Sequence, residues 1–245
     1  MIRSGPLRQI RSLAWFDLCR WRRALALTLL PMMALFGLIE MSPHGGPEAA
    51  GKAMFGLGTL LSAVGVVYLA HRDVAARAAG VVLVRGVSRD TYVLAKLAAV
   101  AGYGFVVVAV VVALDRIAQW QAGEAVQAGA WIWWGHYVVE GVFSLVALGA
   151  FALVFGPGPG AALYFTSVYG FVALATFDGV PAPFAWLGRL LSVVSVPPDF
   201  PAHASGFRCQ EPALWVYGAA MLDRVWVAML YVLVALAVWH RRDLR

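Results

Sequence analysis

The stretch HRDVAARAAGVVLVRGVSRDTYVLAK, residues 71–96, lies between two long apolar runs and holds five of the nineteen Lys and Arg residues. The whole chain is 62% hydrophobic and only 13% charged, and its mean hydropathy is positive. Soluble domains carry about 25% charged residues, so the composition predicts an integral membrane protein. In such a protein, a basic loop between two spans fixes which side of the membrane the loop occupies.

Six apolar runs surround this loop, and each reaches or approaches the roughly 20 helical residues that cross a hydrocarbon core of about 30 Å. The runs are Ala24–Met41, Ala53–Ala70, Val93–Leu114, Trp131–Phe155, Ala161–Phe177 and Ala219–Trp239. They lack the ten-residue alternating pattern of membrane β-barrel strands. The sequence therefore predicts a single all-α domain over residues 1–245, with six transmembrane helices.

The distribution of Lys and Arg predicts the orientation. Six precede the first span, five lie in 71–96 and three follow the last span, so one side holds fourteen and the other holds five. By the positive-inside rule both termini are cytoplasmic, in a multi-pass protein of a cell membrane such as the bacterial inner membrane. Because the net charge of +6 lies beside apolar spans, membrane lipids are favoured over nucleic acid as its partner. Cys19 and Cys209 then lie on opposite sides and cannot pair within one chain.

Three segments outside the spans also carry predictions. Residues 6–23, within the N-terminal segment 1–23, predict a helix in the inner membrane interface whose arginines reach lipid phosphates; a basic flank that only sets topology is the alternative. Its apolar side would hold Leu7, Ile10, Leu13, Ala14, Leu18 and Trp21. The sequence GPGPG at 156–160 predicts a tight inner turn. The external segment 178–218 holds six prolines, and Phe184–Val196 has apolar residues at helical spacing.

Motifs for catalysis and nucleotide binding are missing. The sequence has no G-x-S-x-G, H-E-x-x-H or G-x-x-x-x-G-K-[ST] pattern. It therefore predicts no catalytic residue, no metal site, no cofactor in this chain and no P-loop of its own. His136 and Glu140 are four residues apart in the fourth run, so they share a helix face. This pair either lines a substrate path, as ionisable residues inside membranes often do, or lies at the outer headgroups beside an aromatic belt.

The basic loop has an internal pattern. Asp73 and Arg77 fall on the polar side of a mostly small and aliphatic segment, which Gly86 ends. Ser88 is then a predicted N-cap for a helix that continues through Tyr92 and Lys96 into the third span. A helix, a break and a second helix on the cytoplasmic face would offer a surface to a soluble partner. A loop that only sets topology is the alternative.

The sequence VVLVRGVSRDTYVLAKLAAV, residues 81–100, resembles the loop of the ABC type 2 transporter permeases. The matching residues are Leu83, Arg85, Val87, Ser88, Arg89, Tyr92 and Lys96. The family often has Pro where Gly86 stands, Gly where Ala95 stands, and Glu before the loop where this chain offers Asp73. Residues 10–23 are similar to the family's N-terminal connecting helix, and WHRRDLR at the end is similar to its basic tail.

The resemblance implies that the chain is the membrane-spanning half of an ABC exporter. Residues 71–92 would be the cytoplasmic coupling loop, which would seat in a separate P-loop ATPase subunit that binds ATP and Mg²⁺. The residues implied at that contact are Asp73, Arg77, Arg85, Ser88 and Arg89. A second permease half, identical or related, is implied as well. A six-span membrane enzyme that uses His136 and Glu140, or an accessory structural membrane subunit, are the competing hypotheses.

Overall fold

The structure, a computed structural model, describes residues 5–40, 61–72, 87–121, 130–167, 181–184, 186 and 214–241. Within these residues the chain is almost entirely helical and holds no strand, which confirms the predicted all-α class. The main helices are α1 (Pro6–Glu40), α4 (Arg89–Gln121), α5 (Ala130–Phe155), α6 (Pro157–Phe165) and α9 (Leu214–Arg241). Residues 61–72 form a further helical segment.

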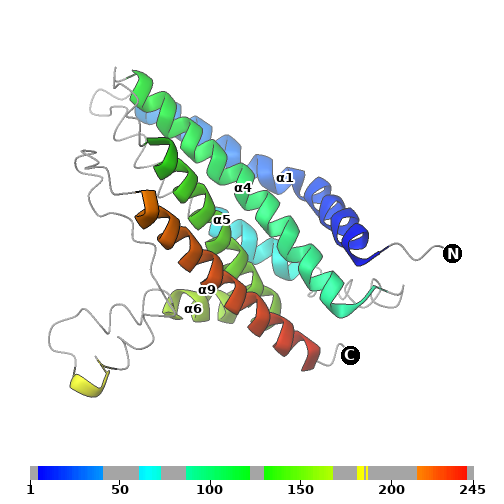
Figure 1. Cartoon of the computed structure of the whole chain (residues 1–245). Coiled ribbons are helices and arrows are strands. Elements are labelled where there is room, and N and C mark those ends of the chain that lie inside the picture. The colour runs from blue at the N-terminus through cyan, green and yellow to red at the C-terminus, as the bar shows by residue number, and fades with distance from the viewer. Residues whose placement is uncertain are drawn as a thin grey trace.

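The four long helices lie side by side in the order α1, α4, α5, α9 (Figure 1). Neighbours in this row pack on one another, α4 also touches α9 over a small area, and α6 packs on α5. The starts of α1 and α4 and the end of α9 lie at one end of the bundle (Figure 1). We call it the Ser88 end, after the residue that precedes α4. Helix α4 runs away from the Ser88 end, whereas α5 and α9 both run towards it (Figure 1).

Two of the described helices are long and apolar enough to cross a membrane, namely Pro6–Ile39 and Arg89–Leu114. Gly141–Phe155 and Ala228–Arg241 are shorter apolar helices. These helices indicate membrane association. The third, fourth and sixth predicted runs fall within α4, α5 and α9. Parts of the second and fifth runs, residues 53–60 and 168–177, lie outside the described residues.

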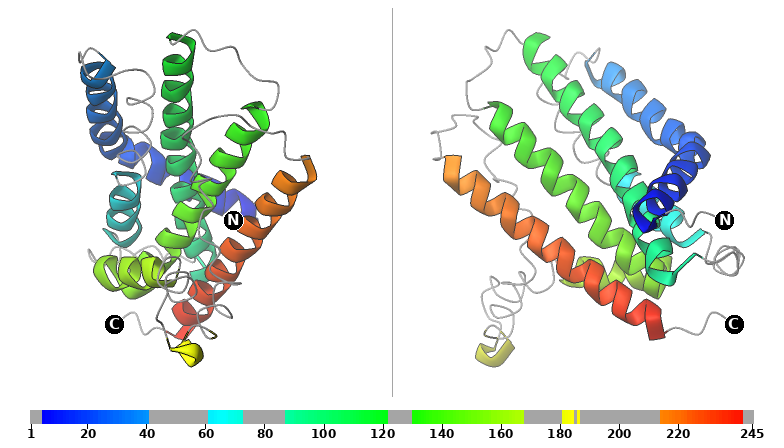
Figure 2. Two further views of the ribbon diagram at one scale, coloured as in Figure 1. Left: turned by 90° about the vertical axis from the view of Figure 1, so that its left-hand side faces the viewer. Right: turned by 45° about the vertical axis from the view of Figure 1, so that its right-hand side comes forward.

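Helix α1 joins two elements that the sequence analysis separates at residue 23. No Gly or Pro stands between Arg20 and Thr28, and the residues there are mostly good helix formers, so the helix continues without interruption. It also contains Pro31. Figure 2 shows that α1 changes direction along its length, so that its first part crosses the bundle at an angle to the rest.

Much of the predicted apolar side of residues 6–23 packs on the protein, although Leu7 at its start is 80% exposed. Ala14 and Trp21 are buried, and Leu18 lies so close to Gly102 of α4 that a Cβ there would come within 2.9 Å of Leu18 Cδ1. Small residues at such positions allow helices in membranes to approach closely. The periodicity therefore identified most of the buried side of this segment, but that side faces α4 and not lipid.

The turn predicted at 156–160 is shorter than expected. Gly156 has a φ of 95°, a conformation that favours glycine, and α6 begins directly after it at Pro157. Proline suits the first helical position because its φ is already helical and no N–H is needed there. The turn is therefore Gly156 alone. A Cβ on Gly156 would lie 3.9 Å from His71, which places the end of segment 61–72 beside this turn.

Candidate functional site: the junction at the start of α4

Ser88 begins the candidate site because it sets where α4 starts. Its Oγ accepts a hydrogen bond from the Thr91 N–H at 3.1 Å and donates one to Thr91 Oγ1 at 2.7 Å. The Ser88 carbonyl accepts the Tyr92 N–H at 3.0 Å. The predicted N-cap is confirmed, and the helix continues through Tyr92 and Lys96 as expected. This cap fixes the register in which the following side chains project.

The next two residues hold the end of α9. Arg89 Nη1 donates to the carbonyl oxygen of His240 at 3.0 Å. The ring of His240 lies with Nε2 2.7 Å from Oδ1 of Asp90. Both contacts are favourable for the helix dipoles. The negative Asp90 lies in the first turn of α4, and the positive guanidinium of Arg89 lies at the last turn of α9. The two partly exposed contacts therefore join the start of one helix to the end of another.

Two turns into α4, Lys96 forms a buried ion pair with α1. Its Nζ lies 2.7 Å from Asp17 Oδ2, and the two side chains are only 3% and 8% exposed. The same Nζ lies 5.6 Å from the ring centroids of both Trp21 and Tyr92, within reach of cation–π attraction. A charge pair this deeply buried has lost its water. Each member therefore depends on the other for compensation.

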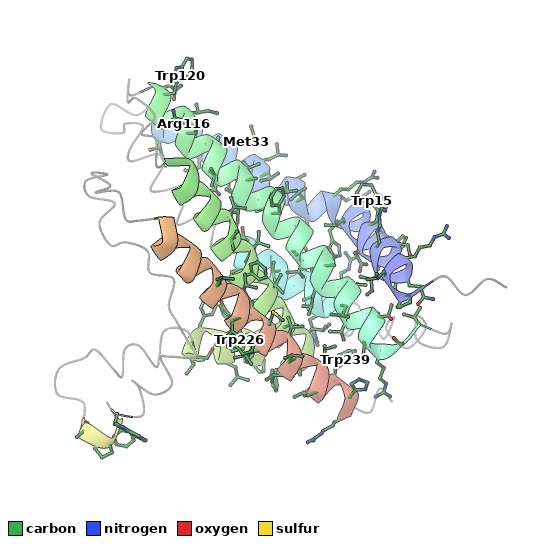
Figure 3. All side chains as sticks on the ribbon, viewed as in Figure 1. Trp15, Met33, Arg116, Trp120, Trp226 and Trp239 are labelled. Atoms are coloured by element: carbon green, nitrogen blue, oxygen red, sulfur yellow. The ribbon has the colours of Figure 1, made fainter. Side chains whose placement is uncertain are left out.

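Tyr92 extends this contact to α9. Its ring stacks on that of Trp239, with centroids 6.1 Å apart and planes 18° from parallel, and both side chains are buried. Figure 3 shows Trp239 near the end of α9, at the Ser88 end of the bundle. A chain of contacts thus runs from α1 through α4 to α9, formed by Asp17, Lys96, Tyr92 and Trp239. We call these four, with Ser88, Arg89, Asp90, Trp21 and His240, the junction.

The residues that the sequence analysis proposed for a partner contact are only partly described. Ser88 and Arg89 belong to the junction, where Ser88 caps α4 and Arg89 binds the His240 carbonyl. Asp73, Arg77 and Arg85 lie outside the described residues. The other proposed pair, His136 and Glu140, belongs to the first half of α5, towards the end of the bundle opposite the junction (Figure 1).

Sequence reasoning missed Asp17, Trp239 and His240 as parts of a site. A signal was present for Asp17, which is the single acidic residue in the stretch 6–23 among five arginines. It also lies three residues after Ala14 and four before Trp21, on the side that proved buried. A lone carboxylate on the buried side of a basic helix predicts a cationic partner elsewhere in the fold. The sequence alone does not identify that partner.

A second polar contact lies farther along the same helices. The hydroxyls of Thr28 in α1 and Tyr103 in α4 are 2.7 Å apart and buried, and Thr28 also donates to the Ala24 carbonyl at 3.0 Å. Gly65 of segment 61–72 approaches the Tyr103 hydroxyl so closely that a Cβ there would collide with it. Hydroxyl pairs of this kind stabilise helix association in membranes.

The described residues include no group of three or more His, Cys, Asp or Glu side chains that could hold a metal ion. The chemistry at the junction is that of charge pairing, capping and ring stacking. No protein-family model matches the chain, and a search of curated protein sequences finds no significant match.

Proposed function

We propose that this chain is the permease subunit of an ABC transporter, a bundle of six membrane spans with both termini in the cytoplasm. In this proposal a separate P-loop ATPase supplies the energy, and two permease halves form the transport path. Support comes from the resemblance of residues 81–100 to the loop of that family and from the apolar helices. The substrate path would pass the His136 and Glu140 positions of α5.

One observation supports this function most directly: the start of α4 is attached to both the first and the last described helix. The proposed coupling loop, 71–92, leads straight into that start. A load applied to the loop by a docked ATPase would be carried by Lys96 to α1, and by Arg89 and Tyr92 to α9. A loop that only sets topology requires positive charge and no such attachment.

In this proposal the loop residues have two roles. Ser88 is used as the cap of α4 and Arg89 holds the end of α9, so both position the loop. Direct contact with the ATPase then falls to Asp73, Arg77 and Arg85. Among these, the arginines suit a bidentate contact with a carboxylate, which a lysine cannot reproduce.

Co-expression with a P-loop ATPase encoded beside this chain tests the proposal. We expect the ATPase to co-purify and to be stimulated by the permease, whereas the double variant Arg77→Ala/Arg85→Ala loses both effects. The matched control, Arg116→Ala, changes an arginine far from the Ser88 end and leaves both effects intact. Normal assembly and stimulation in the double variant, or ATP hydrolysis by the purified chain alone, would contradict the proposal.

Orientation needs a separate measurement, because loss of coupling could also follow from inverted insertion. In intact cells an impermeant maleimide should modify Cys209 and spare Cys19 in the wild type and in both variants. Modification of Cys19 under these conditions would place the junction and the loop on the wrong side for a cytoplasmic ATPase.

A further inference from the structure

The outward side of the first part of α1 combines aromatic and basic residues. Trp15 is 68% exposed and Phe16 is 63% exposed. Figure 3 shows Trp15 on the side of α1 that faces away from the bundle. Trp15 is seven residues from both Arg8 and Arg22, which places the three along one stripe of the helix. Phe16 and Arg23 form a neighbouring stripe, and all three arginines are exposed.

The charge of this surface has one sign. Asp17 is the single acidic residue of 6–23, and its carboxylate is turned inward to Lys96 at 2.7 Å. This ion pair neutralises the only carboxylate of the segment, which could otherwise offset the positive charge of its arginines. The exposed side of the segment is therefore positively charged, through Arg8, Arg11, Arg22 and Arg23.

The position of the surface favours a membrane over a soluble partner. Trp15 lies nine residues before the first predicted span, which is about 14 Å along a helix at 1.5 Å per residue. The same helix then exposes Leu27, Leu30 and Leu38 over a length that could cross a membrane. Tryptophan is enriched at the level of lipid headgroups, and guanidinium groups bind phosphate oxygens in bidentate geometry.

We propose that the first part of α1 is a binding surface for the headgroups of anionic phospholipids. Arg8, Arg11, Arg22 and Arg23 contact phosphates, while Trp15 and Phe16 insert at the boundary between headgroups and acyl chains. The side that enters the lipid is thus opposite to the apolar side predicted from periodicity, which α4 covers. This proposal does not depend on an ATPase partner.

Spin labels on the full-length chain test which side meets the lipid. In a Cys19→Ser/Cys209→Ser background, single cysteines at positions 15 and 16 carry a nitroxide, and the protein is reconstituted in phosphatidylcholine vesicles with and without phosphatidylglycerol. We expect both labels to be accessible to oxygen and protected from a water-soluble nickel chelate. A label at position 14, which is buried against α4, should be protected from both reagents. Labels at 15 and 16 that are open to the chelate, or shielded from both reagents as in a protein interface, would overturn the proposal.

Bound lipid tests the charge requirement. Native mass spectrometry of the detergent-solubilised protein should show phosphatidylglycerol adducts that the variant Arg8→Gln/Arg11→Gln/Arg22→Gln/Arg23→Gln loses by on the order of tenfold or more. Two double variants separate position from total charge. Arg8→Gln/Arg22→Gln removes two positive charges from the proposed surface and should lose adducts. Arg116→Gln/Arg241→Gln removes two positive charges elsewhere and should keep them. Equal loss in the two pairs, or full retention in the fourfold variant, would overturn the anionic-lipid site. If the fourfold variant fails to fold, the two pairs and the spin labels decide the matter.

Discussion

Helices α1 and α4 are similar in length and are both apolar enough to cross a membrane, but the protein covers them to different degrees. Half of the most apolar window of α4 is buried, against 17% of that of α1. Apolar character therefore does not tell a central helix from a peripheral one. The difference comes from position, since α4 contacts α1 on one side and α5 on the other. The peripheral α1 is held by its extensive packing on α4, within which the buried ion pair and the hydroxyl pair are the specific polar contacts.

The largest effect is expected where α1 and α4 share a buried charge. Lys96→Met leaves the Asp17 carboxylate buried without its cation and should cost about 3–5 kcal/mol of stability, whereas Lys96→Met/Asp17→Leu should be close to wild type. Thermal unfolding of the purified protein in detergent measures both variants, with exposed Arg22→Gln as the control. Equal destabilisation in the single and double variants would mean that the pair does not act as a unit.

Two leucines, one buried in α4 and one exposed on α1, test directly how much the protein covers each helix. Leu97→Ala in α4 removes a buried side chain and should cost about 2 kcal/mol, mainly through the cavity it leaves. Leu30→Ala in α1 removes one that is 65% exposed and should change stability by less than about 0.5 kcal/mol. Similar losses at the two positions would show that a second protein surface covers α1.

The cap at the start of α4 should have an intermediate and local effect. Ser88→Ala removes the acceptor for the Thr91 N–H and should cost about 1 kcal/mol. Hydrogen exchange should accelerate in the first turn of α4 and leave the middle of the helix unchanged, while Ser88→Asp, another good cap, should restore protection. Uniform acceleration along α4 would argue against a local cap.

Among the polar contacts of α4, the smallest effect is expected at the hydroxyl pair. Tyr103→Phe removes one side of the contact with Thr28, but Thr28 keeps its bond to the Ala24 carbonyl. Membrane hydrogen bonds of this kind contribute about 0.6 kcal/mol on average, so unfolding should shift only slightly. A loss as large as that of Lys96→Met would identify this pair, and not the ion pair, as the main attachment of α1.

Local signals allowed the sequence to predict much of the helical structure. Ser88 as a cap, the run Val93–Leu114 within α4, and the end of α5 at Phe155 before a glycine all follow from nearby residues. The same rules also favour a helix start at Pro157, where α6 begins, whereas the glycines and prolines of 156–160 led to the prediction of a turn over the whole segment.

The junction could not be predicted in this way. The ion pair joins Asp17 to Lys96, and the ring stack joins Tyr92 to Trp239, so both depend on which helices become neighbours. Periodicity selected the side of residues 6–23 that holds Ala14 and Trp21, but the pattern is the same whether lipid or α4 covers that side. Only the position of Lys96 in the fold shows that α4, and not lipid, covers this side of residues 6–23.

The stack of Trp239 on Tyr92 also has a consequence for biosynthesis. Asp17 and Lys96 can meet once the first part of the chain is made, but Trp239 and His240 come after every other residue of the junction in the chain. The contacts of α4 with α1 can therefore form before those with α9. Until α9 has been made, the ring of Tyr92 lacks its stacking partner.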